Sequence, residues 1–310
     1  MHLYKPNFWN YRKSFFSIIF LPLSFIFWIF MYLRKKIVKK TKFNIPIICV
    51  GNIYVGGTGK TPLTINIAKE LAKRGKKPAI VRKYYKSHND EHNMILENYD
   101  HLILDKKRKL AINRAIENKF DAVILDDGFQ DYKIKKDLNI LCFNSNQLIG
   151  NGFVFPSGPL REDLSSIKNV NIVVINGEKN KEFERKILDI NNNLKIYYSN
   201  YKPLNIEDLK DKKLLAVSGI GNPENFFKIL KDNDLNLQKT LIYPDHYQFN
   251  KYEIQKIIDK ADKQNYQIVM TEKDYYKIKD FNFKKIRYLR IELELQKKDE
   301  IIKDILKIYD

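Results

Sequence analysis

Short apolar runs alternate along this chain with longer stretches in which apolar positions recur at helical spacing. The runs are four to seven residues long and rich in β-branched side chains, which is typical of strands buried on both faces. They occupy residues 45–50, 77–81, 101–104, 121–127, 138–143 and 170–175. Residues 62–74 carry the clearest helical pattern. Such alternation predicts an α/β fold with a doubly wound, mostly parallel sheet.

A second series of apolar runs begins near residue 213 and ends with an amphipathic helix near residues 297–309. We interpret it as a smaller α/β lobe that is joined to the first around residues 195–210. The predicted organisation has three parts: an N-terminal membrane-associated helix with a basic flank, a phosphate-loop core, and a smaller C-terminal lobe, at residues 1–42, 43–200 and 201–310.

The N-terminal pattern differs from the rest, because residues 15–33 contain no charge. As a helix these 19 residues are about 28 Å long, close to a hydrocarbon core of roughly 30 Å. We therefore expect this segment to associate with a bilayer. Pro22 leaves two arrangements open, a helix that crosses the membrane and a kinked helix that lies in one leaflet. Six cations follow within residues 34–42, so the two lobes that make up the bulk of the chain are expected on the cytoplasmic side of the membrane.

Composition narrows the classes of partner. Hydrophobic residues make up 44% of the 310 positions and charged residues 30%, a globular balance. The formal net charge of +19 favours anionic partners, which are nucleic acids, acidic lipid surfaces and phosphorylated substrates. Cys49 and Cys142 lie in apolar runs and are interpreted as small buried side chains in a protein without disulfides.

The segment between the first strand and the first helix of the core reads VGGTGKTP. Three glycines allow successive backbone N–H groups to point at one anion. The lysine that follows can reach the outer phosphates of a nucleotide, and the threonine hydroxyl can bind Mg²⁺. Tyr54 stands where the strict pattern G-x-x-x-x-G-K-[ST] has a glycine, and a tight turn is the alternative interpretation. We predict a nucleotide site made by Val55, Gly56, Gly57, Thr58, Gly59, Lys60, Thr61 and Pro62.

Two further segments carry charged side chains suited to phosphate chemistry. AVILDDGFQ ends a predicted strand in two acids, and one of Asp126 and Asp127 is expected to hold Mg²⁺ directly or through water. Paired acids at a strand end also form turns. Residues 150–163, GNGFVFPSGPLRED, form a glycine- and proline-rich loop with Arg161 for phosphate and Glu162 for metal. Taken alone, this last pair is equally consistent with a surface ion pair.

Taken in order, the motifs resemble those of the tetraacyldisaccharide 4′-kinases of lipid A biosynthesis in Gram-negative bacteria. The resemblance covers nearly the whole chain: PNFW and the apolar segment, VGNIYVGGTGKTP, NDE, DDGFQ, GNGFVFPSGPLRE, SGIGNPENFF, YPDHYQF and TEKD. It implies a kinase at the bacterial inner membrane that moves the γ-phosphate of ATP to the 4′-hydroxyl of a lipid-linked glucosamine disaccharide 1-phosphate. An anionic membrane surface is a second expected partner, and nucleic acid is not expected.

The resemblance also implies roles for individual residues. The acid matching Asp90 and the histidine matching His246 form a dyad that activates the sugar hydroxyl. Lys60 serves catalysis as well as binding. The metal set comprises Thr61, Asp126, Asp127 and Glu162, and arginines matching Arg108 and Arg161 contact phosphate or substrate. Because Asp90 and His246 fall in different predicted lobes, we hypothesise that lobe closure assembles the dyad.

The chain departs from the family pattern at a few positions. RKYYK at residues 82–86 replaces a usual R-G-Y-G-G, Asp131 follows DDGFQ where a histidine is common, and His92 replaces a proline. These changes concern substrate contacts and the placement of Asp90 and leave the nucleotide site intact. Two rival functions remain: a membrane-tethered nucleotide switch, which shares the phosphate loop, and a nucleic-acid ATPase, which rests on charge alone.

Overall fold

The protein divides into two compact units. The computed structural model describes residues 6–85, 89–245 and 247–309, and of residues 89 and 90 the backbone only. The core unit comprises Pro6–Tyr84, Tyr99–Asn200 and the residues from Leu293 onward. The smaller unit comprises Tyr85–Asn98 and Tyr201–Glu292.

The core unit is built on an eight-stranded sheet with the order β12-β7-β6-β5-β1-β4-β2-β3. From β3 to β7 every neighbouring pair is parallel; Ile48, for example, pairs with Ile124 on one side and Leu138 on the other. The predicted α/β fold with a mostly parallel sheet is thus confirmed. The strands are β1 Ile47–Gly51, β2 Pro78–Lys83, β3 Leu102–Asp105, β4 Ala122–Asp126, β5 Leu138–Asn144, β6 Ile172–Asn176, β7 Lys195–Pro203 and β12 Ile291–Leu295.

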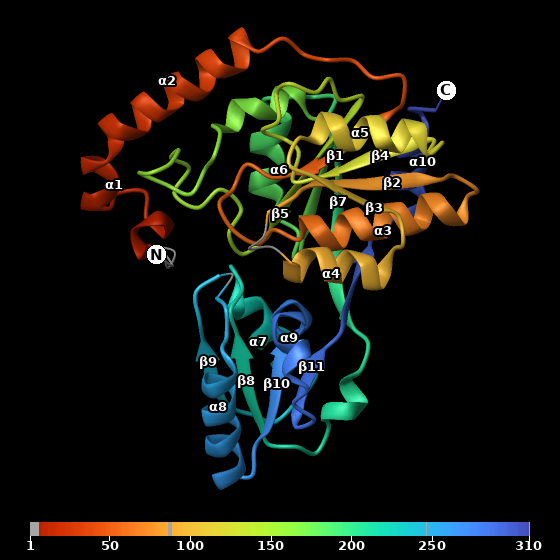
Figure 1. Ribbon diagram of the computed structural model, residues 1–310. Helices are drawn as coiled ribbons and strands as arrows, with labels where there is room; N and C mark the ends of the chain where they lie inside the picture. Colours follow the sequence, from red (N-terminus) through yellow and green to blue (C-terminus); the bar gives the residue numbers. More distant parts are fainter. Residues whose placement is uncertain (1–5, 86–88, 246, 310) are drawn as a thin grey trace. The chain divides into compact units, whose positions relative to one another are not determined.

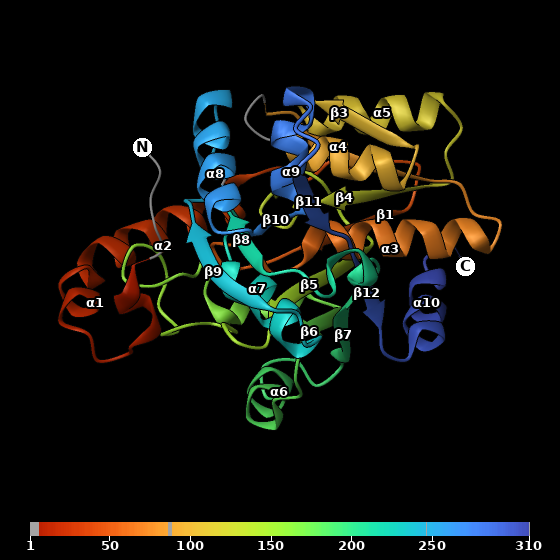
Figure 2. The ribbon, with the colours of Figure 1, turned by 90° about the horizontal axis from the view of Figure 1, so that it is seen from below.

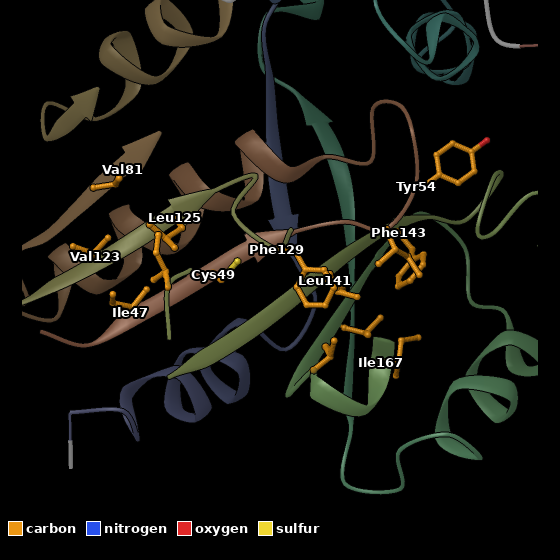
Figure 3. Close-up of a cluster of buried hydrophobic side chains, with 14 of the residues drawn as sticks. Ile47, Cys49, Tyr54, Val81, Val123, Leu125, Phe129, Leu141, Phe143 and Ile167 are labelled. Carbon is orange, nitrogen blue, oxygen red and sulfur yellow. The ribbon is translucent and has the colours of Figure 1, made fainter. Parts of the chain in front are cut away.

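Helices cover both faces of this sheet. Helix α3 (Lys60–Lys73) lies on one face and α5 (Arg108–Glu117) on the other (Figure 1). The crossover from β1 to β2 runs toward the edge strand β3, whereas the crossover from β3 to β4 runs back toward the centre, and right-handed crossovers in opposite directions cover opposite faces. Helix α6 (Lys181–Leu188) packs on the α5 face, and α10 (Lys298–Leu306) packs against α3. The α5 face forms a continuous apolar core that includes both aromatic rings and β-branched side chains (Figure 3).

Strand β1 lies at the centre of the sheet, between β4 and β5. From β1 the chain crosses to β2 and β3, returns to β4, and only then continues to β5 on the opposite side. The order of strands therefore reverses at β1. In open parallel sheets, ligands bind outside the carboxyl ends of the strands at such a switch point.

The uncharged N-terminal stretch forms two helices, α1 (Phe15–Ile19) and α2 (Leu21–Ile37), separated at Phe20. Pro22 lies in the first turn of α2, where its missing N–H costs no helix hydrogen bond. Of the two arrangements left open by Pro22, the kinked one agrees with the break at Phe20, whereas a continuous helix over residues 15–33 is not found. Among the described helices, none has the combination of length and apolarity that a membrane crossing requires.

The smaller unit contains a four-stranded parallel sheet with the order β11-β10-β8-β9 (Figure 2). Helices α8 and α9 pack on one face and α7 on the other. Helix α4 also belongs to this unit and packs against α9. Its elements are α4 Asn89–Asn98, β8 Leu214–Ser218, α7 Pro223–Asp232, β9 Leu237–Ile242, α8 Lys251–Lys263, β10 Gln267–Thr271, α9 Glu272–Ile278 and β11 Ile286–Leu289.

This division of the chain differs from the predicted ranges in two places. The segment that holds Asp90 was expected in the core, yet α4 groups with the smaller unit, where Lys279 of the α9 end forms an ion pair with Glu97 at 2.6 Å. The last helix was expected in the C-terminal lobe, yet α10 packs in the core unit on α3, to which Arg74 and Asp299 link it. Strand β7 occupies part of the predicted joint at residues 195–210.

Candidate active site

A glycine-rich loop connects β1 to α3 at the switch point. Gly59 has φ +93°, a left-handed conformation that glycine adopts without strain, and it caps the N-terminus of α3. The side chain of Asn52 donates hydrogen bonds to the carbonyl oxygen of Gly56 at 3.3 Å and to the hydroxyl of Thr58 at 3.1 Å. The loop is thus braced from within, and the positive end of α3 is available to an anion. All the residues from Val55 to Pro62 predicted to bind nucleotide lie in this loop or the first turn of α3.

Tyr54 explains how the loop does without its first glycine. The residue is fully buried, and its ring is part of the apolar core of the α5 face (Figure 3). Its backbone forms an antiparallel bridge with Leu160. The large side chain therefore points into the core, so it does not occupy the phosphate loop itself.

Asp126, at the end of β4, is fully buried and lies next to the start of α3. It accepts hydrogen bonds from the hydroxyls of Thr61 at 3.1 Å and Thr64 at 3.3 Å. The guanidinium of Arg82, from the end of β2, forms an ion pair with the same carboxylate. Arg82 is missing from the predicted site, although its place at the end of a strand beside β4 is the signal that could have found it.

Asp127 follows in a left-handed conformation, with φ +54°, which turns its carboxylate toward two cations. Lys60 Nζ lies 3.8 Å from its Oδ1, and Arg161 Nη1 lies 3.2 Å from the same atom. Burial alone would raise the pKa of Asp127, but Lys60 first and then the nearby arginines outweigh it and hold that pKa well below its ordinary value. Burial lowers the pKa of Lys60, and Asp127 opposes this effect.

The turn that carries these acids is packed tightly against β1. A Cβ at Gly51, the last residue of β1, would lie 2.6 Å from Cβ of Phe129. A Cβ at Gly128 would lie 2.7 Å from Cβ of Leu125. Both glycines therefore permit a close approach that fixes the position of Asp127 relative to the phosphate loop.

Arg108, at the start of α5, holds the backbone of the two acids. Its Nη2 donates to the carbonyl oxygens of Asp126 at 3.2 Å and Asp127 at 2.7 Å. Its Nη1 lies 3.5 Å from a carboxylate oxygen of Asp131, the residue that stands where the family pattern has a histidine. In this structure Arg108 therefore supports the acidic turn, and its predicted contact with phosphate or substrate stays a prediction.

Glu162 is buried near the same edge of the sheet but has different partners. Gln130 Nε2 donates to its carboxylate at 3.1 Å, and Lys35 Nζ from α2 lies 3.6 Å away. Burial raises the pKa of Glu162, which Lys35 opposes only in part. In the described part of the chain, no three or more His, Cys, Asp or Glu side chains gather as a metal cluster. Glu162 as a metal ligand stays a prediction.

The proposed dyad falls mostly outside the described residues. His246 lies outside them, and Asp90 is described only as backbone in the first turn of α4. The neighbours of both are in the smaller unit: Lys273 Nζ lies 3.0 Å from Glu91 and 3.4 Å from Asp245. Both dyad segments thus belong to one unit, so closure of one lobe on another is not what brings these segments together. The lobe-closure hypothesis is wrong on this point because α4 packs against α9.

The buried pair of Arg82 and Asp126 generates a stability prediction. Arg82→Met leaves a buried carboxylate without its cation, which costs about 3–5 kcal/mol of unfolding free energy. Urea denaturation measures the loss, and adding Asp126→Asn to the same chain is expected to recover part of it. Arg114→Met is the matched control, since Arg114 pairs with Asp105 at a more exposed site, where the cost is below about 1 kcal/mol. Equal losses in the two single variants would contradict the prediction.

The lowered pKa of Asp127 generates a pH prediction. Its folded-state pKa lies below the ordinary value of 3.8, so the unfolded chain takes up the proton first as the pH falls. The stability that Asp127 contributes is complete above that ordinary value and is lost as the pH falls further. We expect Asp127→Asn to flatten the pH dependence of stability below about pH 4. The urea unfolding midpoints of the wild type and of Asp127→Asn are measured at about six pH values between about 2.5 and about 6. If the two plots of midpoint against pH run parallel, the assignment to Asp127 is refuted.

Known proteins share the motifs of this chain along nearly its whole length. The sequence matches the family model for tetraacyldisaccharide-1-P 4′-kinase over residues 16–309. The tetraacyldisaccharide 4′-kinase of Pelagibacter ubique (strain HTCC1062) is 41% identical over 315 residues, which cover 99% of each chain. The protein of the same name from Rickettsia akari (strain Hartford) is 32% identical over 319 residues, covering 97% of this chain and 96% of that one.

The fold has a counterpart among solved structures. The crystal structure of LpxK from Aquifex aeolicus in complex with ATP matches 95% of this chain and 99% of its own, with a TM-score of 0.73 and 23% sequence identity. At that identity the match shows the fold, while the family model and the relatives supply the assignment. The resemblance predicted from the motifs is confirmed, and the chain belongs to the tetraacyldisaccharide-1-P 4′-kinase family.

Proposed function

We propose that this protein transfers the γ-phosphate of ATP to the 4′-hydroxyl of a tetraacyldisaccharide 1-phosphate lipid. The observation that carries the proposal is the braced phosphate loop, with Lys60 and the Thr61–Asp126 pair at the switch point of the sheet, in a chain matched to the kinase family over nearly its whole length. Phosphoryl transfer depends chiefly on alignment and charge neutralisation, and this edge of the sheet concentrates the groups that provide both.

The ion pairs around Asp127 support a specific mode of nucleotide binding. Without a ligand, Lys60 and Arg161 neutralise the carboxylate of Asp127. The outer phosphates of ATP carry the same type of charge and are expected to take over one or both cations. The backbone N–H groups at the start of α3 supply further hydrogen bonds to the phosphates. Lys60 is thereby placed to stabilise charge on the transferring group.

The donor set also suits a magnesium ion. Magnesium prefers oxygen ligands, and the hydroxyl of Thr61 lies 3.1 Å from a carboxylate oxygen of Asp126. Thr61 with Asp126 or Asp127 would hold the ion, and Glu162 is the more distant candidate of the predicted set. When bound, the ion neutralises charge on the β- and γ-phosphates. Arg82 and Arg108 keep the acidic turn in place around it.

The acceptor hydroxyl requires a proton acceptor, and the proposal assigns this role to Asp90 with His246 as its partner. An aspartate with an ordinary pKa near 3.9 is ionised at neutral pH but is a weak base, and a histidine can share the proton that it takes. The support within the smaller unit is that Lys273 contacts both Glu91 and Asp245, the sequence neighbours of the pair.

The N-terminal helices support an association with the membrane. In α1 and α2 the buried residues are Ser17 and Ser24, whereas phenylalanine, isoleucine and leucine side chains are exposed. This is the reverse of a helix that faces water, and a large exposed apolar surface marks an interaction site. Arg34 and Lys36 lie in the last turn of α2, and Lys35 between them pairs with Glu162. We propose that the pair lies in the cytoplasmic leaflet of the inner membrane, with its basic end at anionic headgroups.

The dyad separates the kinase from a nucleotide switch. We expect Asp90→Ala and His246→Ala to reduce transfer to the disaccharide lipid by at least about 100-fold, since general base catalysis contributes 10²–10⁴-fold. Nucleotide binding should change little. Mass spectrometry measures the phosphorylated lipid product, and equilibrium binding of a labelled ATP analogue measures nucleotide binding separately. Transfer at the wild-type rate in both variants would remove the dyad, and ATP hydrolysis without any lipid product in the wild type would favour the switch.

The membrane proposal predicts graded release from vesicles. Phe25→Ser combined with Phe30→Ser removes two exposed rings from α2 and is expected to weaken binding to anionic vesicles at least about 10-fold, because each buried aromatic contributes roughly 1.5–3 kcal/mol. Leu110→Ser, at an exposed apolar position on α5, is the matched control. Vesicle sedimentation measures the effect, and high salt should detach the wild type only in part. Complete release of the wild type by salt would contradict insertion of the apolar face.

A further inference from the structure

Buried polar contacts join the N-terminal helices to the loop at residues 150–163. Ser24 Oγ of α2 donates to the carbonyl oxygen of Val154 and accepts from the backbone N–H of Ser157, both at 2.8 Å. Asn151 Nδ2 donates to Ser17 Oγ of α1 at 3.0 Å. The two serines that face inward from these otherwise apolar helices are thus used to hold this loop.

The same loop is fastened to the phosphate loop at its other end. The backbone N–H of Arg161 donates to the carbonyl oxygen of Ile53 at 2.7 Å, and the N–H of Val55 donates to the carbonyl oxygen of Pro159 at 2.8 Å. These bonds run along the segment that leads directly into the glycines. Residues 150–163 therefore connect α1 and α2 to the phosphate loop through hydrogen bonds on both sides.

Two side chains of α2 reach the charged end of the loop. Trp28 Nε1 donates to Asp163 Oδ2 at 2.8 Å, while Asp163 Oδ1 accepts from the N–H of Ser165 and caps the short helix that follows. About two helical turns further along α2, Lys35 Nζ lies 3.6 Å from Glu162. Asp163 and Glu162 directly follow Arg161, the partner of Asp127.

We infer that α2 is a positioning element of the active site, and that Trp28 is a positioning residue that holds Arg161 and Glu162 in place through Asp163. This inference rests on the proposed function. A helix that served only as an anchor would need its apolar surface alone. Here an indole N–H and an ammonium group are directed inward, onto two consecutive acids of the loop that carries a predicted phosphate-binding arginine.

The consequence is that seating of α1 and α2 on a membrane and the geometry of the phosphate site are linked. Under the proposed function, the acceptor lipid would reach the protein from the membrane that the apolar side chains of α2 face. The opposite side of the same helix supports Arg161 and Glu162. Damage to this support is expected to slow phosphoryl transfer even when the acceptor is water-soluble and no membrane is present.

The test uses Trp28→Phe in the full-length protein. Phenylalanine keeps an aromatic ring for stacking between Phe25 and Tyr32, whose rings lie 6.0 and 5.6 Å from that of Trp28, but it lacks the N–H. With a deacylated disaccharide 1-phosphate as acceptor, we expect kcat to fall about 10-fold and the acceptor KM to change less than about twofold. Hydrogen exchange of peptides covering residues 150–163 should rise, which is a readout independent of activity.

Ile26→Val is the matched control, because Ile26 lies on the same helix with 62% of its surface exposed and has no polar side-chain group that could bond to the loop. It is expected to leave kcat on the soluble acceptor and hydrogen exchange in the loop at wild-type values.

A second variant, Asp163→Ala, removes the acceptor of the indole N–H. Trp28→Phe should cause no further loss of kcat in that background, since the two residues act as one unit.

Unchanged kcat and unchanged exchange in Trp28→Phe would overturn the inference. Faster exchange with wild-type kcat would also overturn it, because the contact would then be structural only. If Trp28→Phe fails to fold, as judged by thermal unfolding, Lys35→Met carries the same test at Glu162. The proposed function fails by a different result, the absence of any phosphorylated lipid when wild-type protein receives the acylated acceptor in vesicles. The exchange measurement remains valid in either case.

Discussion

The neutralisation of two consecutive carboxylates at the carboxyl end of β4 is the constraint on which the rest of the site depends. Asp126 is fully buried, and an unpaired charge there would be very costly, so Thr61, Thr64 and Arg82 converge on it. Asp127 is satisfied by Lys60 and Arg161. These partners come from three separate segments of the chain, the start of α3, the end of β2 and the loop at residues 150–163, and the need to satisfy the two acids brings them to one edge of the sheet.

The same set of charges suits nucleotide chemistry because a triphosphate can replace a carboxylate as the partner of a cation. Asp127 fixes the positions of Lys60 and Arg161. Under the proposed function, these two cations would need no reorganisation from solvent when nucleotide binds. The glycines that let the acidic turn approach β1 serve the same end. Gly51 and Gly128 leave no room for a side chain, so the position of Asp127 is set by backbone packing.

The smaller unit also contains a buried carboxylate that is neutralised by its neighbours. Asp274 is fully buried and accepts hydrogen bonds from Gly219 N at 2.8 Å and Thr271 Oγ1 at 2.7 Å, while Lys277 pairs with it. This network joins two motifs of the family resemblance, TEKD and SGIG, and gives both a structural role. Beside it, Lys273 holds the neighbours of Asp90 and His246 together. The segment with Asp90 follows β2 in sequence, yet its contacts lie with α9.

The sequence by itself determined most of the elements and the places of the candidate site residues within them, because strand burial, helix periodicity and the phosphate loop are local signals. Residues 45–50 predict β1 within two residues at the start, and Lys60, Thr61, Asp126 and Asp127 follow from their places beside a strand end. Only the tertiary structure decided which side chains pair with one another. Arg82 on Asp126 and Trp28 on Asp163 join residues 44 and 135 positions apart, and no periodicity encodes such pairs. Tertiary structure also decided which unit contains α4 and which contains α10, because a helix belongs to the unit whose surface buries its apolar face.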